Sequence, residues 1–381
     1  MQLGRLFRSS LVRGVGAVAL AVLLSALTLG LAADPALAHV KWFFESEATG
    51  SLRWDLFFQP LPLAFVGGVL LATLAAAILW RRRGRSFVPG PEALGATDER
   101  RSLLYGLVPL ILGVHVAVPL LVNGVQGTLF SPDNTLPGVW GNFLGLAEAG
   151  VALSLFYGGL TRPAAVVLAG LWFNGVFLIG LEPMLENVMF LGFAAFFFFV
   201  GRGPFSIDRL LFPRLEPPVA LARYAIPAVR IGVGLSLATV AFTEKFANLP
   251  LADGFLRESG LNFTPYLGIP LSNEVFAMLA GSVELIVGLW LVLGVFVREI
   301  VIVAWFPINL TLTLFLWEEL IGHLPIYGVM AVLLIWGTGP DNLSLWLKGL
   351  RERLMPVEPE PSEHRTTADR PEPDRQPSPT S

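Results

Sequence analysis

Long apolar stretches separated by short polar segments occupy most of the chain. Nine of them follow residue 60, at approximately 61–80, 103–122, 140–160, 163–181, 187–201, 225–243, 275–297, 300–317 and 323–339. About 20 apolar residues in a helix span the hydrocarbon core of a bilayer, and the backbone polar groups of a helix bond to one another rather than to lipid. The pattern therefore predicts an all-α, polytopic integral membrane protein, with the lipid bilayer as its first partner.

Composition changes this picture little but excludes several kinds of chemistry. Of the 381 residues, 54% are hydrophobic and 14% are charged, whereas soluble domains carry roughly 25% charged residues. The formal net charge of −3 gives no sign of a nucleic-acid partner. The chain has no cysteine, which excludes disulfides, thiol catalysis, cysteine-ligated iron–sulfur clusters and c-type haem attachment.

The N-terminal segment has the pattern of a secretory signal. Three arginines precede an apolar run at 15–31, and the small residues Ala36 and Ala38 flank Leu37. This order of basic, apolar and small residues predicts a signal peptide over 1–38. Cleavage after Ala38 would make His39 the first residue of the mature chain, outside the cytoplasm. An uncleaved membrane anchor remains the alternative interpretation.

The distribution of basic residues predicts the orientation. Most arginines fall in the connections on one side, and the other side receives only Lys41, Arg53, Lys245 and Arg257. Cytoplasmic connections carry the excess of Lys and Arg. The sequence thus predicts a multi-pass protein of a bacterial-type inner or plasma membrane, with nine transmembrane helices after signal removal, the mature N-terminus extracytoplasmic and the C-terminus cytoplasmic.

The two halves of the chain resemble each other. One fixed offset pairs Tyr105 and Gly113 with Tyr224 and Gly232, and a second pairs Glu148, Gly158, Arg162, Glu182 and Gly192 with Glu284, Gly294, Arg298, Glu318 and Gly328. Matches of polar residues and glycines at fixed offsets indicate an internal repeat. We therefore expect two tandem four-helix units in the same orientation.

The predicted division of the chain follows from the spans, the repeat and the composition of the ends. The last segment is rich in Pro, Glu, Ser and Thr and has no apolar periodicity, which is typical of disorder. The predicted parts are the signal peptide (1–38), an extracytoplasmic amphipathic segment (39–60), a leading transmembrane helix (61–85), a cytoplasmic linker (86–102), the first unit (103–202), a second cytoplasmic linker (203–223), the second unit (224–340) and a cytoplasmic, largely disordered tail (341–381).

The second unit resembles a known family. Its Arg230-Ile-Gly motif, the sequence Glu244-Lys245-Phe246, an intramembrane Glu284 and a Gly-x-x-x-Arg turn ending at Arg298 are similar to those of DoxX-type four-helix membrane domains. The first unit departs from the pattern, with Leu112 or Gly113 near the position of Arg230 and Gln126 opposite Lys245. The resemblance implies a membrane protein linked to respiratory or sulfur redox chemistry, and the subunits of thiosulfate:quinone oxidoreductase are relatives.

Ionisable residues in the predicted spans are the first candidates for chemistry. Charges in a bilayer are costly and often functional, so Glu284, Arg230 and Glu148 are candidate catalytic residues for proton exchange or ligand positioning. A carboxyl whose pKa is raised by burial suits proton exchange with a quinone. Structural interpretations stay open: Arg230 as a snorkelling side chain, and each glutamic acid as a hydrogen-bond donor.

A second set of polar residues lies at the predicted outer membrane face. The candidate ligand-binding residues there are Lys245, Glu244, Glu318, Glu319 and His323. Glu319 and His323 are four residues apart, which places them on one face of a helix. The alternative is that these side chains are only solvated helix ends.

Three functions remain open on the sequence. The first is a redox-associated subunit that handles a quinone, or electrons and protons, near the outer face; because no flavin, haem or nucleotide motif occurs, it would need a separate redox partner. The second is a carrier or copper-handling protein, in which the α-amine and imidazole of a mature N-terminal His39, with His323, form a metal site. The third is an assembly scaffold. Whether the chain is an enzyme, and whether it forms an oligomer, stays open.

Overall fold

The structure is a computed structural model that describes residues 40–43 and 52–337. The predicted signal peptide, His39 and the tail at 341–381 lie outside these residues. Within them, six helices are long and apolar enough to cross a membrane: Pro60–Arg83, Gly106–Gln126, Thr161–Leu178, Val219–Phe246, Asn273–Leu293 and Glu319–Trp336, with a shorter apolar helix at Met189–Val200. The prediction of a helical, multi-pass membrane protein is thereby confirmed, whereas the count of nine spans stays a prediction.

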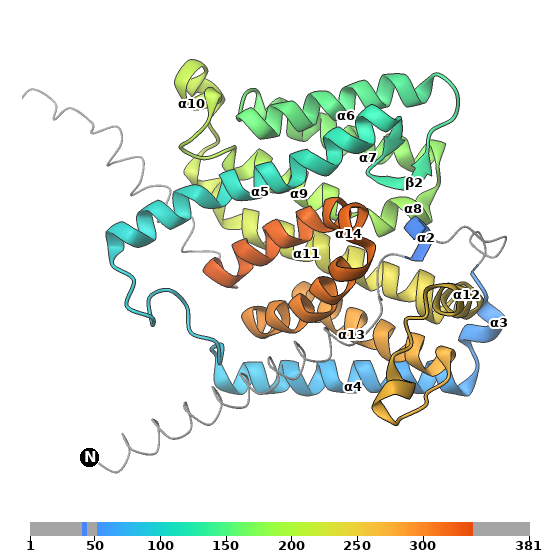
Figure 1. Cartoon of the computed structure of the whole chain (residues 1–381). Helices are drawn as coiled ribbons and strands as arrows, with labels where there is room; N and C mark the ends of the chain where they lie inside the picture. Colours follow the sequence, from blue (N-terminus) through green and yellow to red (C-terminus); the bar gives the residue numbers. More distant parts are fainter. Residues whose placement is uncertain (1–39, 44–51, 338–381) are drawn as a thin grey trace, which may run out of the picture.

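The main helices follow the predicted spans closely (Figure 1). They are α4 (Pro60–Arg83), α5 (Asp98–Gln126), α6 (Trp140–Tyr157), α7 (Thr161–Leu178), α9 (Met189–Val200), α11 (Ala225–Val240), α13 (Asn273–Leu293) and α14 (Val297–Trp336). Short elements connect them: α2 (Val40–Phe43), α3 (Trp54–Phe57), α8 (Leu181–Glu186), α10 (Ile207–Leu211), α12 (Leu249–Ser259), the 3₁₀ turns η2 (Pro213–Leu215), η3 (Val219–Tyr224) and η5 (Thr264–Leu267), and the π-helical turn η4 (Ala241–Phe246).

These short elements define two ends of the molecule (Figure 1). The hairpin end contains α2, α3, α8, α12 and a two-stranded antiparallel hairpin of β1 (Thr128–Leu129) and β2 (Ser131–Thr135), with Thr128 opposite Thr135 and Leu129 opposite Ser131. The arginine end contains α10 and the last turn of α4, with its arginines Arg81, Arg82 and Arg83. The hairpin is a small departure from the expected all-α fold, and the pattern of apolar spans carries no signal for it. That the arginine end faces the cytoplasm stays a prediction.

Helix α14 contains two of the predicted spans in one uninterrupted helical element. Arg298 Nε donates a hydrogen bond of 2.8 Å to the carbonyl of Leu334. In a straight helix these residues would be about 54 Å apart at a rise of 1.5 Å per residue, so the element folds back on itself, as Figure 1 shows. It contains Pro307 and Pro325, and proline inside a helix removes a backbone hydrogen bond and favours bending.

Several local features recur at the offset that predicted the repeat. Arg162 Nε donates to the carbonyl of Phe198 at 3.1 Å, as Arg298 does to that of Leu334. The turns before these arginines also match, because Leu160 and Phe296 have positive φ angles of 54° and 45°. Both turns thus use the same backbone geometry and the same arginine cap. These matches favour the two-unit architecture, which stays a prediction.

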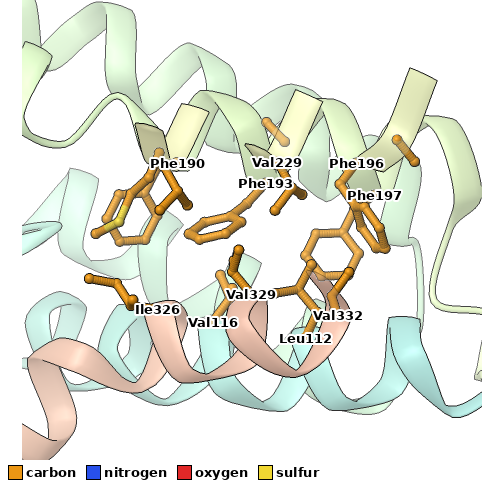
Figure 2. Packing of buried hydrophobic residues seen from close by; sticks show 14 of the residues in the cluster. Leu112, Val116, Phe190, Phe193, Phe196, Phe197, Val229, Ile326, Val329 and Val332 are labelled. Atoms are coloured by element: carbon orange, nitrogen blue, oxygen red, sulfur yellow. The ribbon is translucent and has the colours of Figure 1, made fainter. Parts of the chain in front are cut away.

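One hydrophobic core joins the two halves. Figure 2 shows phenylalanines of α9 facing side chains of α5, α11 and α14, and the labelled residues are Leu112, Val116, Phe190, Phe193, Phe196, Phe197, Val229, Ile326, Val329 and Val332. Helices α9 and α11 approach closely at Gly192 and Gly232, where a Cβ added to Gly192 would lie 2.8 Å from the carbonyl oxygen of Ala228. The predicted units therefore share a packed interface instead of forming separate bundles.

Candidate functional site

A pocket lies between α11, η4, α13 and both limbs of α14. Most of its wall is apolar, and three ionisable side chains interrupt it. The lining residues are Leu237, Val240, Lys245, Val283, Glu284, Val287, Ala304, Pro307, Ile308 and His323. Ligand pockets typically have a mostly apolar wall with a few polar groups that orient the ligand. The lining therefore makes this pocket the candidate functional site.

An ion pair forms the polar centre of this pocket. Lys245 Nζ lies 2.9 Å from Glu284 Oε2 and 3.6 Å from Glu244 Oε2. The Lys245 side chain is 3% exposed, that of Glu244 1% and that of Glu284 26%. The lysine is thus enclosed between two carboxylates, and of these carboxylates that of Glu284 is the more accessible.

The backbone around Lys245 explains how it reaches both partners. Residues Ala241–Phe246 form the π-helical turn η4 at the end of α11. A π-helical turn is rare and is found frequently at functional sites. Gly281 on α13 lies against it, because an added Cβ there would stand 3.0 Å from Lys245 Cβ. This close approach brings Lys245 beside Glu284, one helical turn further along α13.

A second charged cluster adjoins Glu244 at the hairpin end. The backbone N–H of Val40 donates to Glu244 Oε2 at 3.0 Å. Lys41 Nζ lies 2.6 Å from Glu186 Oε1 and 3.1 Å from Glu182 Oε1. Thr243 Oγ1, on η4, donates to the same Glu186 oxygen at 2.5 Å. The segment α2 is therefore tied by polar contacts to α8 and η4.

Electrostatics keep Lys41 charged in this cluster. Burial of the ammonium group lowers its pKa, but the carboxylates of Glu186, Glu244 and Glu182 raise it by more, so that the pKa of Lys41 lies above its ordinary value of 10.5. Val40 packs beside it in a small apolar cluster with residues of α12, including Leu251 and Phe255. Both polar and apolar contacts thus hold this short segment in place.

His323, on the pocket wall, lies beside the buried side chain of Glu319. Its Nδ1 lies 3.2 Å from Oε1 of Glu319 and 3.2 Å from the Glu319 carbonyl oxygen. The Glu319 carboxyl is fully buried, and neither of its oxygens accepts a hydrogen bond. The predicted sharing of one helix face by Glu319 and His323 is confirmed. The side chain of Glu318 lies outside the part of the chain that the structure describes.

The other two intramembrane candidates lie away from this pocket. Arg230 packs against Gly294 at the far end of α13, about 15 Å along the helix from Glu284 at 1.5 Å per residue. Glu148, on α6, is fully buried and accepts a hydrogen bond of 3.1 Å from the backbone N–H of Phe130. The structure therefore brings Lys245, Glu284 and His323 together, with Glu244 and Glu319 beside them, and brings neither Arg230 nor Glu148 to them.

Sequence reasoning did not place Lys41 and Thr243 at the site, although both contact Glu186 beside the pocket. Lys41 stands among Val40, Trp42 and Phe43 directly after the predicted cleavage site, a context that suggests an anchor at the membrane interface. A solitary lysine in an apolar segment was the available signal, because such a charge needs a partner when it is buried. No pattern in the sequence names that partner.

The metal alternative is not supported by a ligand cluster in the described part of the chain. Among residues 40–43 and 52–337, no group of three or more His, Cys, Asp or Glu side chains is placed to hold a metal ion. His39, the other predicted ligand, lies outside the described residues, so this prediction stays untested. No protein-family model, no curated protein and no solved structure matches the chain. The fold and the site define a helical multi-pass membrane protein with a pocket that is lined in part by ionisable side chains.

Proposed function

We propose that the chain is a redox-associated membrane subunit, DoxX-like in its two-unit architecture, whose pocket binds the head group of a quinone. The observation that carries this proposal is an apolar pocket with Lys245, Glu284 and His323 on its wall. The resemblance of the second unit to DoxX-type domains, some of whose relatives act on quinones, supports it further.

The chemistry of a quinone suits these residues. Its ring is flat and apolar, which matches the aliphatic walls formed by α11, α13 and α14. Its two carbonyl oxygens accept hydrogen bonds, and the Lys245 ammonium and the His323 imidazole are donors. Charge-assisted hydrogen bonds are roughly twice as strong as neutral ones, so Lys245 supplies most of the orientation.

The acidic residues exchange protons with the bound quinone. Reduction of a quinone to a quinol takes up two electrons and two protons. Glu284 is 26% exposed and exchanges protons with one quinone oxygen, and the His323–Glu319 pair serves the other. The electrons come from a donor protein outside this chain, because its sequence contains no motif for a flavin, haem or nucleotide. On this proposal the chain binds, orients and protonates the quinone, and its partner protein supplies the electrons that reduce it.

Quinone binding tests the proposal directly. The purified protein in nanodiscs is titrated with decylubiquinone and with a short-chain menaquinone, and binding is followed by quenching of tryptophan fluorescence. We expect saturable binding that weakens by about tenfold or more in His323→Leu, which loses a hydrogen bond to the ligand worth about 1.5 kcal/mol. Binding should also weaken in Glu284→Gln, which loses the carboxylate that positions the Lys245 ammonium.

A matched control separates the pocket from its surroundings. Ser282 lies on α13 two residues before Glu284, and its hydroxyl donates to the carbonyl of Met278 on its own helix. Ser282→Ala is expected to bind both quinones as the wild type does. Equal quinone affinity in all four proteins, or binding without saturation, would overturn the proposal, provided that each variant elutes as a single folded species.

A further inference from the structure

We propose that a second pocket, at the arginine end, binds a phosphate-type anion through Arg202, Arg209 and Arg162. It lies at the opposite end of the fold from the quinone pocket and shares no residue with it, so this inference is independent of the proposed function. The lining residues include the three arginines, Asp208, Glu216 and the apolar residues Phe199, Val200, Leu215 and Val219.

Arg202 carries the argument. Although charged, this residue is only 2% exposed. Its Nε and Nη2 donate to the carbonyl oxygens of Leu155 and Phe156 at the end of α6, at 2.5 and 2.9 Å. Its Nη1 is buried and has no hydrogen-bond partner. A buried arginine nitrogen without a partner is costly, and an anion in the adjoining pocket would supply the missing acceptor.

Two glycines on neighbouring elements make room for the Arg202 side chain. A Cβ added to Gly113 on α5 would stand 2.5 Å from Arg202 Nε, and one added to Gly158, after α6, would stand 2.5 Å from Arg202 Cγ. Gly158 also has a φ angle of +71°, which glycine adopts without strain. Two glycines thus leave room for this guanidinium, which lies beside the pocket with one nitrogen unused.

A second arginine has a nitrogen in the same state. Arg209 Nη2 is buried without a hydrogen-bond partner. The third, Arg162, uses Nε to bond the carbonyl of Phe198 and places its guanidinium 4.5 Å from the centre of the Phe198 ring. Nitrogens of two arginines therefore remain for a shared acceptor, and an anion with several oxygens matches them.

The balance of charge indicates the class of anion. Three arginines and two acidic residues line the pocket, an excess of one positive charge. Asp208 accepts hydrogen bonds from the backbone N–H groups of Leu160 and Thr161, at 2.5 and 2.8 Å, and so caps the start of α7. One excess positive charge fits a phosphodiester, which carries one negative charge. Burial lowers the pKa of Arg202 to about 10, as expected for a cation whose counterion would come from a ligand.

Two sources supply such a group: the head group of an anionic lipid and soluble phosphate. The apolar part of the lining and the place of the pocket at the ends of α7 and α9 favour the lipid, because basic pockets beside membrane helices bind anionic head groups. The shared chemistry is one phosphate group held by Arg202 and Arg209, and the experiment distinguishes its source.

Native mass spectrometry of the full-length protein provides the test. The protein in detergent micelles receives equal amounts of phosphatidylglycerol and phosphatidylcholine, and the fraction of protein that retains one lipid is measured. Wild type is expected to retain phosphatidylglycerol at least tenfold better than phosphatidylcholine. Arg209→Gln is expected to lose most of this preference. Arg214, at the same end but outside the pocket lining, provides the control Arg214→Gln, which keeps the preference.

A second arm uses inorganic phosphate. Thermal unfolding is followed with and without millimolar phosphate at constant ionic strength. Stabilisation by phosphate that Arg209→Gln abolishes, without a preference for phosphatidylglycerol, would support the anion site and assign it to a soluble ligand. Equal losses in Arg209→Gln and Arg214→Gln would overturn the site, as would wild-type protein with no preference in either arm. Arg202→Gln serves as a further variant if it folds without its cap on α6; Arg209→Gln decides the matter if it does not.

Discussion

The ion pair of Lys245 offers the sharpest test of the architecture around the pocket. Its ammonium group is 3% exposed and lies between the carboxylates of Glu284 and Glu244, at 2.9 and 3.6 Å. Replacing it in Lys245→Met removes the charge and nearly preserves the volume. Two carboxylates then face each other without a cation, in surroundings from which water is largely excluded.

The structure sets the size of the effect. Removing one partner of a buried ion pair costs about 3–5 kcal/mol, because the remaining charge is buried without compensation. At about 1.4 kcal/mol per factor of ten, the unfolding equilibrium shifts between roughly a hundredfold and several thousandfold. Lys245→Met combined with Glu284→Gln removes one of the stranded charges. We expect this double variant to recover about 0.5–3 kcal/mol, the range of coupling between residues in contact.

The measurement is the free energy of unfolding in mixed detergent micelles, followed by tryptophan fluorescence. The control is Arg257→Met, because Arg257 pairs with Asp253 on the surface of α12 and is 74% exposed. An exposed pair contributes about 0.5 kcal/mol. If Lys245→Met costs no more than Arg257→Met, or if Glu284→Gln recovers nothing in the Lys245→Met background, the reasoning about the enclosed pair is wrong.

Three further predictions concern packing, the linker and pH. Gly192→Leu should abolish folded protein in detergent, judged by size-exclusion chromatography, because its backbone contacts α11 directly, whereas Gly150→Ala should leave the elution unchanged, since nothing lies within 4 Å of an added Cβ there. Glu299→Ala should speed proteolysis within 86–97, because it removes the carboxylate that accepts from the Val88 N–H at 2.9 Å and also from that of Phe87. Equal cleavage rates would contradict this. The pKa of Lys41 is raised above 10.5, so its stabilising contribution is complete below pH 10.5 and is lost as the pH rises through the raised value. Lys41→Met should therefore lower the melting temperature equally at pH 7 and pH 9. A decrease in melting temperature that halves by pH 9 would refute this.

Part of the candidate site could be predicted from the chain alone. Glu284 and Lys245 stand out because charges in apolar spans are rare and costly, and the spacing of Glu319 and His323 places them on one helix face. The structure keeps all four near one pocket. Arg230 is also a rare charge in an apolar span, yet it lies beside Gly294 and away from the pocket. Position along the helix decides which charges meet, and the rarity of a charge gives no information about its distance from the others.

The sequence by itself determined the membrane class and the helices, because hydrocarbon accepts only chains whose backbone polar groups are satisfied internally, and long apolar runs record that requirement locally. Tertiary structure alone decided the rest. The return of α14 onto itself, the docking of Lys41 onto Glu186, and the meeting of Arg162, Arg202 and Arg209 around one pocket join residues distant in the chain. Such contacts depend on helix packing: Gly113 and Gly158 make room for Arg202, and Gly192 lets α9 approach α11, only because the facing helices lie where they do.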